Sequence, residues 1–392
     1  MNSNSSSKSN YYLDLDDPAY FADINQKKEF MQYNVKERNY PPFNIPEPAE
    51  SELHAGGVHL DLHPAQALVA NIMNPNTNSN RLLIKWDPGM GKTVVACSIA
   101  MQYLHMISMK LKTSDLGEIN SFVNVIGFTE EIFQDELLKF PEFGFISKDE
   151  LDQLKKYKLK RYESKIDGDK YVEYFSQIKS RLSNKRGYGF FRFYGYRAFV
   201  NRIFLYDESK IENILDMGEE QIRESLRNGS LKWNKPLLES FHNSLMICDE
   251  IHNAYNSVEK NNWGSSIQLV LDYHKDNMKA IFMSATPINN KPTEIIDIMN
   301  MILPYNQKIK RDDFFDSDNN LNPNATDRIG KLSMGRVSFM QDTNPAYFAE
   351  DKYVGETIKN IPYLKFIKCP MGSFHQACYD ANYTGTLNKE SE

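Results

Sequence analysis

The stretch LLIKWDPGMGKTVVACSIA, residues 82–100, constrains the fold more than any other part of this chain. An apolar run leads into a glycine-containing turn with a lysine and a threonine, and a second apolar run follows. Glycines let backbone N–H groups converge on phosphate oxygens where a Cβ would intrude. The pattern predicts a strand, a phosphate-binding loop and a helix, in which the loop residues would hold ATP: Gly89, Met90, Gly91, Lys92 and Thr93.

Trp86 stands where the strict GxxxxGK[ST] pattern has its first glycine. The alternative interpretation is a glycine turn that carries a surface lysine. The strand expected before the turn and the helix expected after it favour the phosphate site. In that site Lys92 would neutralise the β- and γ-phosphates, and the Thr93 hydroxyl would hold Mg²⁺.

A second motif, LMICDEIH, places two carboxylates at the end of an apolar strand. Asp249 would hold the same Mg²⁺ as Thr93, and Glu250 would orient or deprotonate the attacking water. A lone acidic pair after a strand is more often a helix cap. With the phosphate loop upstream, the sequence favours Lys92, Asp249 and Glu250 as the catalytic set.

A third motif, FMSATP, follows another apolar strand. Ser284 and Thr286 are suited to hydrogen-bond the acidic cluster and His252, and so to couple these motifs to the nucleotide. His252 could instead be a metal ligand, but no second His or Cys lies at ligand spacing. The coupling role is therefore the better interpretation.

Apolar strands alternate with helical segments along the chain, which predicts an α/β fold with a mostly parallel sheet and helices on both faces. We expect a disordered or extended arm over residues 1–55 and an ATP-binding domain over 56–306. A helical insertion at about 147–188 and a C-terminal extension over 307–392 complete the expected organisation. The composition of the insertion, rich in Lys, Arg and Tyr, is too poor in aliphatic residues for a central core.

Charge and cysteine content narrow the class of protein. The net charge of −6 argues against a uniformly basic nucleic-acid coat but allows a local basic groove. The four cysteines form no CxxC pair, which disfavours a zinc site and a disulfide framework, and Cys97 and Cys248 lie in apolar runs typical of a core. No apolar stretch approaches the ~20 residues of a membrane span. We expect a reducing, intracellular compartment and no membrane partner.

In this order, GMGKT, DEIH and SAT resemble motifs I, II and III of superfamily 2 helicases and translocases. Members of that superfamily often lack the glycine at the position of Trp86. LHPAQ resembles their adenine-reading motif, with Gln66 as the candidate contact. The resemblance implies a RecA-like P-loop domain that uses ATP and Mg²⁺. A different P-loop enzyme, such as a nucleotide kinase, fits the SAT motif poorly.

Further stretches, among them VIGFTEEIFQDELLKFPEFGF, YGYRAFVNRIF and SATPINNKPTEI, are similar to helicases of large cytoplasmic DNA viruses. That group includes poxvirus nucleoside triphosphatase I and the small subunit of the early transcription factor. The resemblance implies a DNA-dependent ATPase of early viral transcription, in initiation or termination. A viral RNA polymerase or transcription-factor subunit would be its partner, in the virion and the viral factory of the host cytoplasm. The alternative is a non-catalytic nucleotide-binding subunit of a transcription factor complex.

The same resemblance assigns nucleic-acid contacts to residues that follow two strands, Thr129, Tyr196 and Arg197, with DNA favoured over RNA. The basic insertion is open to two interpretations, a DNA contact or a solvated helical face. Such enzymes have a second RecA-like domain that supplies arginines to the γ-phosphate. No QxxGRxGR-like motif follows FIKCPMGSFHQACYD. We expect the second RecA-like domain to be absent and this chain alone to hydrolyse ATP slowly.

Overall fold

The computed structural model describes residues 60, 62–113, 122–127, 130–162, 165–183, 189–207, 211, 213–255, 261–341, 356–358, 361–366 and 370–382. The chain divides into two compact units, Met1–Gln341 and Asp342–Glu392. The arm expected over residues 1–55 lies outside the described residues.

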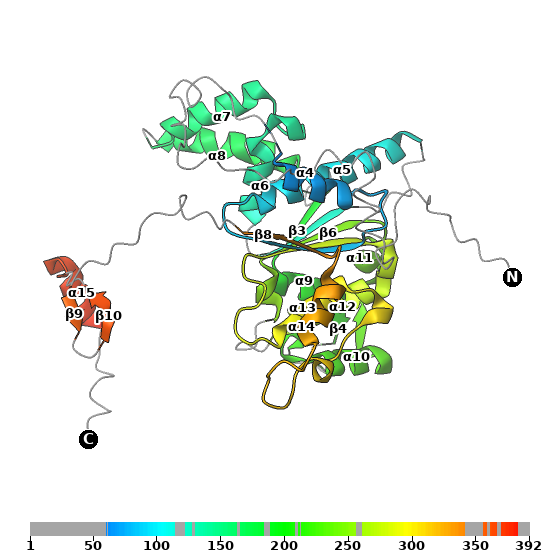
Figure 1. Ribbon diagram of the computed structural model, residues 1–392. Helices are drawn as coiled ribbons and strands as arrows, with labels where there is room; N and C mark the ends of the chain where they lie inside the picture. Colours follow the sequence, from blue (N-terminus) through cyan, green and yellow to red (C-terminus); the bar gives the residue numbers. More distant parts are fainter. Residues whose placement is uncertain are drawn as a thin grey trace, which may run out of the picture. The chain divides into compact units, whose positions relative to one another are not determined.

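The first unit is built on a six-stranded sheet in the order β3-β2-β6-β7-β1-β8 (Figure 1). Every neighbouring pair is parallel, which confirms the expected α/β class. The strands are β1 (Arg81–Trp86), β2 (Val123–Ile126), β3 (Phe191–Tyr194), β6 (Leu245–Asp249), β7 (Lys279–Met283) and β8 (Val337–Met340).

Alternate residues of the central strands enter two separate cores, because successive side chains of a strand point to opposite faces. In β6, Leu245 and Ile247 join one core, and Met246 and Cys248 join the other. Both faces are covered, so the strands read as continuous apolar runs. Helices α4 (Pro64–Ile72), α5 (Lys92–Thr113) and α6 (Glu130–Lys139) cover the first face, and α9 (Tyr196–Ile203), α12 (Trp263–His274) and α13 (Glu294–Ile302) the second (Figure 1).

The expected helical insertion is a hairpin of α7 (Lys148–Lys160) and α8 (Lys165–Ser180), preceded by η1 (Pro141–Phe143). Ser147 caps α7 and forms a reciprocal capping box with Glu150. Arg181 Nη2 lies 2.6 Å from Glu150 Oε1 and lowers the pKa of that carboxyl to about 2. This ion pair closes the base of the hairpin.

Shorter elements lie around the second face. Strands β4 (Phe204–Tyr206) and β5 (Leu231–Trp233) form a separate antiparallel pair. The others are η3 (Ile214–Asp216), α10 (Glu219–Asn228), α11 (Lys235–Glu239), η4 (Ile251–Tyr255) and η5 (Lys275–Asn277).

The ATP-binding domain was expected to end near residue 306, but the compact unit continues to Gln341. The reason is β8, which pairs with β1 and completes the sheet. The polar segment 308–325 is anchored by the buried side chains of Phe314 and Phe315. Elements η6 (Tyr305–Gln307), η7 (Arg311–Asp313) and α14 (Ala325–Ser333) lead to β8.

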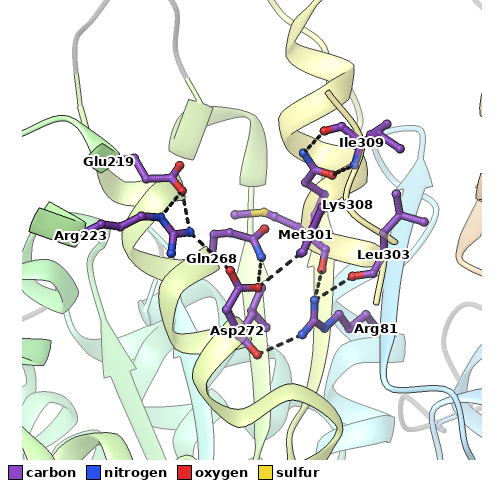
Figure 2. Close-up of polar contacts among 11 residues, drawn as sticks. Arg81, Glu219, Arg223, Gln268, Asp272, Met301, Leu303, Lys308 and Ile309 are labelled. Carbon is purple, nitrogen blue, oxygen red and sulfur yellow. Dashed lines mark hydrogen bonds and ion pairs between the residues drawn. The ribbon is translucent and has the colours of Figure 1, made fainter. Parts of the chain in front are cut away.

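A polar network fixes the end of the sheet opposite the phosphate loop (Figure 2). Arg81, the first residue of β1, donates to Leu271 O at 3.0 Å and to Leu303 O at 2.9 Å. Asp272 lies 3.5 Å from Lys308 Nζ and 3.6 Å from Arg223 Nη2. The network ties α10, α12 and the chain after α13 to the start of β1.

The second unit contains the antiparallel strands β9 (Glu356–Ile358) and β10 (Ile361–Phe366) and the helix α15 (Ser373–Asn382). Across the described parts of both units, no helix has the length and apolar character that a bilayer crossing requires.

Candidate nucleotide site

The turn after β1 has the backbone of a phosphate-binding loop. Gly89 and Gly91 adopt φ of 80° and 77°, a region that side chains with a Cβ enter only with strain. Helix α5 begins directly at Lys92, so its N-terminal N–H groups and dipole face the loop. A Cβ added at Gly89 would meet no atom within 4 Å, which leaves open space beside the loop. These residues fit a bound phosphate chain.

The Lys92 side chain folds back onto the first residues of the phosphate loop. Its Nζ donates to Trp86 O at 2.8 Å and to Asp87 O at 3.2 Å. The two carbonyl groups hold the ammonium at the mouth of α5. That is where a lysine must stand to neutralise phosphate oxygens.

Gln66, the adenine candidate, lies against the same loop. Its Oε1 accepts from His63 N at 2.8 Å, which fixes the start of α4. Its Nε2 lies 3.5 Å from Met90 O and 3.4 Å from Gly91 O. A Cβ on Gly91 would come within 2.2 Å of Gln66 Nε2. The structure thus brings Gln66 to the phosphate loop, while its contact with adenine stays a prediction.

Trp86 is fully buried between the sheet and the α4–α5 face. Its Nε1 donates to Ser338 Oγ on β8 at 3.0 Å. The side chain therefore serves the core and does not compete with phosphate for space in the loop. This accounts for the missing glycine in physical terms.

The acidic pair lies at the same edge of the sheet. Because the strands are parallel and β7 separates β6 from β1, Asp249 stands about 10 Å from the end of β1. Glu250 adopts φ of 50°, a left-handed conformation that costs a non-glycine residue about 1–3 kcal/mol. Its carbonyl accepts from Asn253 N at 3.0 Å and from Asn253 Nδ2 at 3.1 Å, which hold this bend. Asn253, the residue directly after the LMICDEIH motif, is therefore a positioning residue that the motif alone does not identify.

His252 and Ser284 meet as the sequence suggested. His252 Nδ1 lies 2.8 Å from Ser284 Oγ and 3.3 Å from Glu250 Oε2. Ser284 is fully buried, and its hydroxyl also accepts from Thr286 N at 3.0 Å. Thr286 therefore contributes a backbone N–H to this contact. The contacts join the acidic motif to the end of β7.

The structure bears differently on each of the three residues that were expected to contact nucleic acid. Tyr196 is buried, its ring stacks on Trp263 with centroids 5.6 Å apart, and its hydroxyl donates to Asp249 O at 2.7 Å. The expectation of a nucleic-acid contact is corrected, because this ring faces the core and supports the acidic strand. Burial raises the pKa of the Tyr196 phenol well above its ordinary value. Arg197 is exposed and stays a prediction, and Thr129 lies outside the described residues.

The donor set also fits Mg²⁺. A threonine hydroxyl at the start of α5 and a carboxylate at the end of β6 are hard oxygen ligands, and Mg²⁺ commonly takes one or two such ligands with phosphate and water oxygens. Thr93 and Asp249 would hold the ion. When bound, it would screen charge on the phosphates.

A parallel sheet with a phosphate loop after β1 and an acidic pair at the end of β6 defines a helicase-type P-loop ATPase domain. The chain belongs to the family described as "Type III restriction enzyme, res subunit", which matches residues 59–289.

Relatives come from large DNA viruses. The chain is 32% identical over 354 residues to the "Early transcription factor large subunit homolog" of African swine fever virus (isolate Tick/Malawi/Lil 20-1/1983), covering 80% of this chain and 32% of the relative. That name gives the large subunit, where the resemblance above named the small one. Identity is 26% to the "Putative ATP-dependent RNA helicase L377" of Acanthamoeba polyphaga mimivirus, covering 85% and 28%. The chain spans about a third of the length of these relatives.

Among solved structures, the SWI2/SNF2 ATPase core of Sulfolobus solfataricus in complex with dsDNA matches with a TM-score of 0.38 and 14% identity. The match covers 74% of this chain and 46% of that chain. A likeness of that size transfers neither function nor partners.

Proposed function

We propose that the chain is the ATP-binding motor domain of a viral superfamily 2 DNA-dependent ATPase that acts in early transcription. The arrangement of Lys92, Asp249 and Glu250 at one edge of the sheet carries the proposal. The viral transcription-factor relative supports the process, and its name is the reason to favour transcription over other uses of the motor.

Each residue of the site has a distinct part in the proposed hydrolysis. Lys92 and the N–H groups at the start of α5 bind the phosphates and stabilise charge that develops on them. Glu250 Oε2, in reach of His252, orients the attacking water and accepts its proton. Gln66 reads the adenine edge. The contact between His252 and Ser284 couples the nucleotide-bound state of the site to the end of β7.

We propose DNA as the nucleic-acid partner, with Arg197 and Thr129 contacting its backbone. The protein partner would be a viral RNA polymerase or a transcription-factor subunit, and the site of action the virion and host cytoplasm. These proposals are supported by the viral relatives and not by the geometry of the nucleotide site. We also keep the expectation that the chain alone turns ATP over slowly.

The test is ATP binding and hydrolysis by the full chain, with and without single-stranded DNA, beside Lys92→Ala. We expect DNA-stimulated hydrolysis that falls at least about 100-fold in Lys92→Ala, because a transition-state charge stabiliser is worth about that much. Lys148→Ala, an exposed lysine at the base of the hairpin, is the control and keeps wild-type hydrolysis. ATP binding with no hydrolysis under any condition would contradict the motor and favour a non-catalytic transcription-factor subunit.

A further inference from the structure

The α7–α8 hairpin is anchored at its base and extends from the α6 side of the sheet (Figure 1). Leu154 and Ile178 join the core, and Lys179 pairs with Asp135 of α6 at 3.2 Å. Higher up, the Tyr157 and Tyr174 rings meet edge to face at 5.4 Å. The far end, residues 155–162 and 165–166, is the hairpin tip. It is held in shape by the helices but contributes nothing to the core.

The hairpin tip concentrates positive charge. Six of its residues are cationic, and the single acid of that stretch of sequence is Glu163. Lys155 is 3.9 Å from Asp152, whereas Lys156, Lys158 and Lys160 have no acidic partner within 4.0 Å among the described residues. All four lysines are exposed. The cations of the tip are Lys155, Lys156, Lys158, Lys160, Arg161 and Lys165.

The same end also exposes large apolar side chains. Leu159 is 80% exposed, Tyr162 82% and Ile166 68%. Leu159 lies in the last turn of α7, between Lys158 and Lys160, and Tyr162 follows two residues after the helix ends. Exposed apolar groups inside a basic surface differ from an ordinary solvated helix face, where charged residues alone cover the outside.

The Tyr162 ring is held by a neighbouring cation and is exposed enough to stack on a planar group. The Arg161 guanidinium lies over its ring, with Cζ 4.5 Å from the centroid, and donates to its hydroxyl. Arg161 is itself held against Tyr171, at 5.4 Å from that centroid. One face of the Tyr162 ring is thus fixed by a cation, and at 82% exposure the ring remains open for a further planar group.

We propose that the hairpin tip binds single-stranded nucleic acid, with its lysines on the phosphates and Tyr162 stacked on a base. The inference rests on the proposed function only in taking nucleic acid as the partner, and it adds a second contact away from the sheet edge. Lysine–phosphate contacts and aromatic stacking together are how single strands are bound without sequence preference. An acidic protein partner would use the lysines but would not require the exposed Tyr162 ring beside them.

The experiment measures binding of a fluorescent single-stranded DNA oligonucleotide to the full chain by anisotropy over a range of salt concentrations. The first variant is Lys156→Ala/Lys158→Ala/Lys160→Ala. The matched control removes three exposed lysines elsewhere, as Lys148→Ala/Lys235→Ala/Lys331→Ala. The second variant, Tyr162→Ala, keeps the charge.

We expect the tip triple variant to bind about tenfold more weakly and to lose about two units of slope in log K against log salt, since each phosphate contact contributes about 0.7 for a single strand. Tyr162→Ala should weaken binding at least fivefold, the equivalent of about 1 kcal/mol of stacking, with the salt slope unchanged. Both variants should keep ATP hydrolysis measured without DNA.

Other outcomes distinguish failure of the hairpin-tip proposal from failure of the proposed motor function. Unchanged affinity in both tip variants, with DNA bound by the wild type, overturns the hairpin proposal and leaves the motor intact. No DNA binding by the wild type, despite ATP hydrolysis, overturns the hairpin proposal and the DNA dependence together. Equal loss in the tip and control triples also overturns it, because net charge alone would then explain binding. Binding of polyglutamate with the same dependence on the tip lysines, and no dependence of DNA binding on them, would identify an acidic protein partner instead.

Discussion

His252 Nδ1 and Ser284 Oγ lie 2.8 Å apart, so the acidic motif after β6 is hydrogen-bonded to the end of β7. Ser284→Ala removes this bond while the fully buried position accepts the smaller side chain. We expect unchanged ATP affinity but about tenfold weaker stimulation of hydrolysis by DNA, since coupling between sites is worth about 1–3 kcal/mol. ATP titration and hydrolysis with and without DNA measure the two effects. Ser333→Ala, at the half-buried last position of α14, is the control, and equal stimulation in both variants would contradict the coupling role.

Trp86 should matter for stability and not for phosphate contact. Trp86→Ala is expected to lower the free energy of unfolding by about 3–5 kcal/mol, because it empties a fully buried site. Trp86→Phe keeps most of the ring and loses the bond to Ser338, at about 1 kcal/mol. Urea unfolding followed by circular dichroism measures both. Trp86→Gly restores the strict loop pattern, and tighter ATP binding by that variant would show that the tryptophan impairs the site.

Gly89 and Gly91 have nearly the same φ but different surroundings, so they form a matched pair. Alanine at either position carries about 1–2 kcal/mol of backbone strain. Only at Gly91 would the new Cβ collide with Gln66 Nε2, at 2.2 Å. We expect Gly91→Ala to weaken ATP affinity more than Gly89→Ala, as measured by nucleotide titration. Because Gln66 is also the proposed adenine contact, the collision is tested by introducing Gly91→Ala into a Gln66→Ala background. An equally large further loss of ATP affinity there would show that Gln66 is not the cause.

Lys308 gives a pH signature. Burial beside α12 lowers its pKa from 10.5 to about 8, against the opposing attraction of Asp272. Between those values the unfolded chain holds a proton that the folded chain has released. The free energy of unfolding therefore rises with pH across this window, by roughly 1–3 kcal/mol from this residue. Below about pH 8 the lysine is charged in both states, and its contribution is constant.

Lys308→Met should lack that rise. Urea unfolding of wild type and variant at pH 7.5 and pH 9.5 gives the difference, which also cancels the titration of tyrosines common to both. Lys310→Met, an exposed lysine two positions away, should behave as wild type. Parallel stability curves for wild type and Lys308→Met would show that the lysine titrates normally in the folded chain.

Much of the ATP-binding fold followed from local pattern. The apolar runs at Leu82, Leu245 and Lys279 became β1, β6 and β7. A continuous apolar run identifies a buried parallel strand well, because a strand covered on both faces has little room for polar residues. The parallel arrangement followed from the alternation of strands and helices, since parallel neighbours need a crossover between them.

The sixth strand did not follow from pattern. Val337–Met340 is a short stretch with mostly half-exposed side chains, and its place beside β1 depends on a partner some 250 residues earlier in the chain. The burial of Tyr196 was missed for a related reason. A tyrosine directly after a strand has the same local signature whether it faces solvent or, as here, stacks on Trp263 and donates to Asp249 O. Contacts between distant segments decide both cases.

The indole of Trp86 and the hydroxyl of Ser338 are separated by 252 positions in the sequence. A growing chain therefore makes its phosphate loop long before it makes the strand that secures the loop's leading residue. During synthesis at about 5–20 residues per second, β1 stays unpaired on both edges until β7 is made, and its second edge stays unpaired for several seconds more until β8 is made. We expect the nucleotide site to reach its final form only after residue 340 has left the ribosome. ATP is therefore not expected to stabilise a nascent chain that ends before β8. The loop nearest the start of the domain is thus among the last parts to reach its final form.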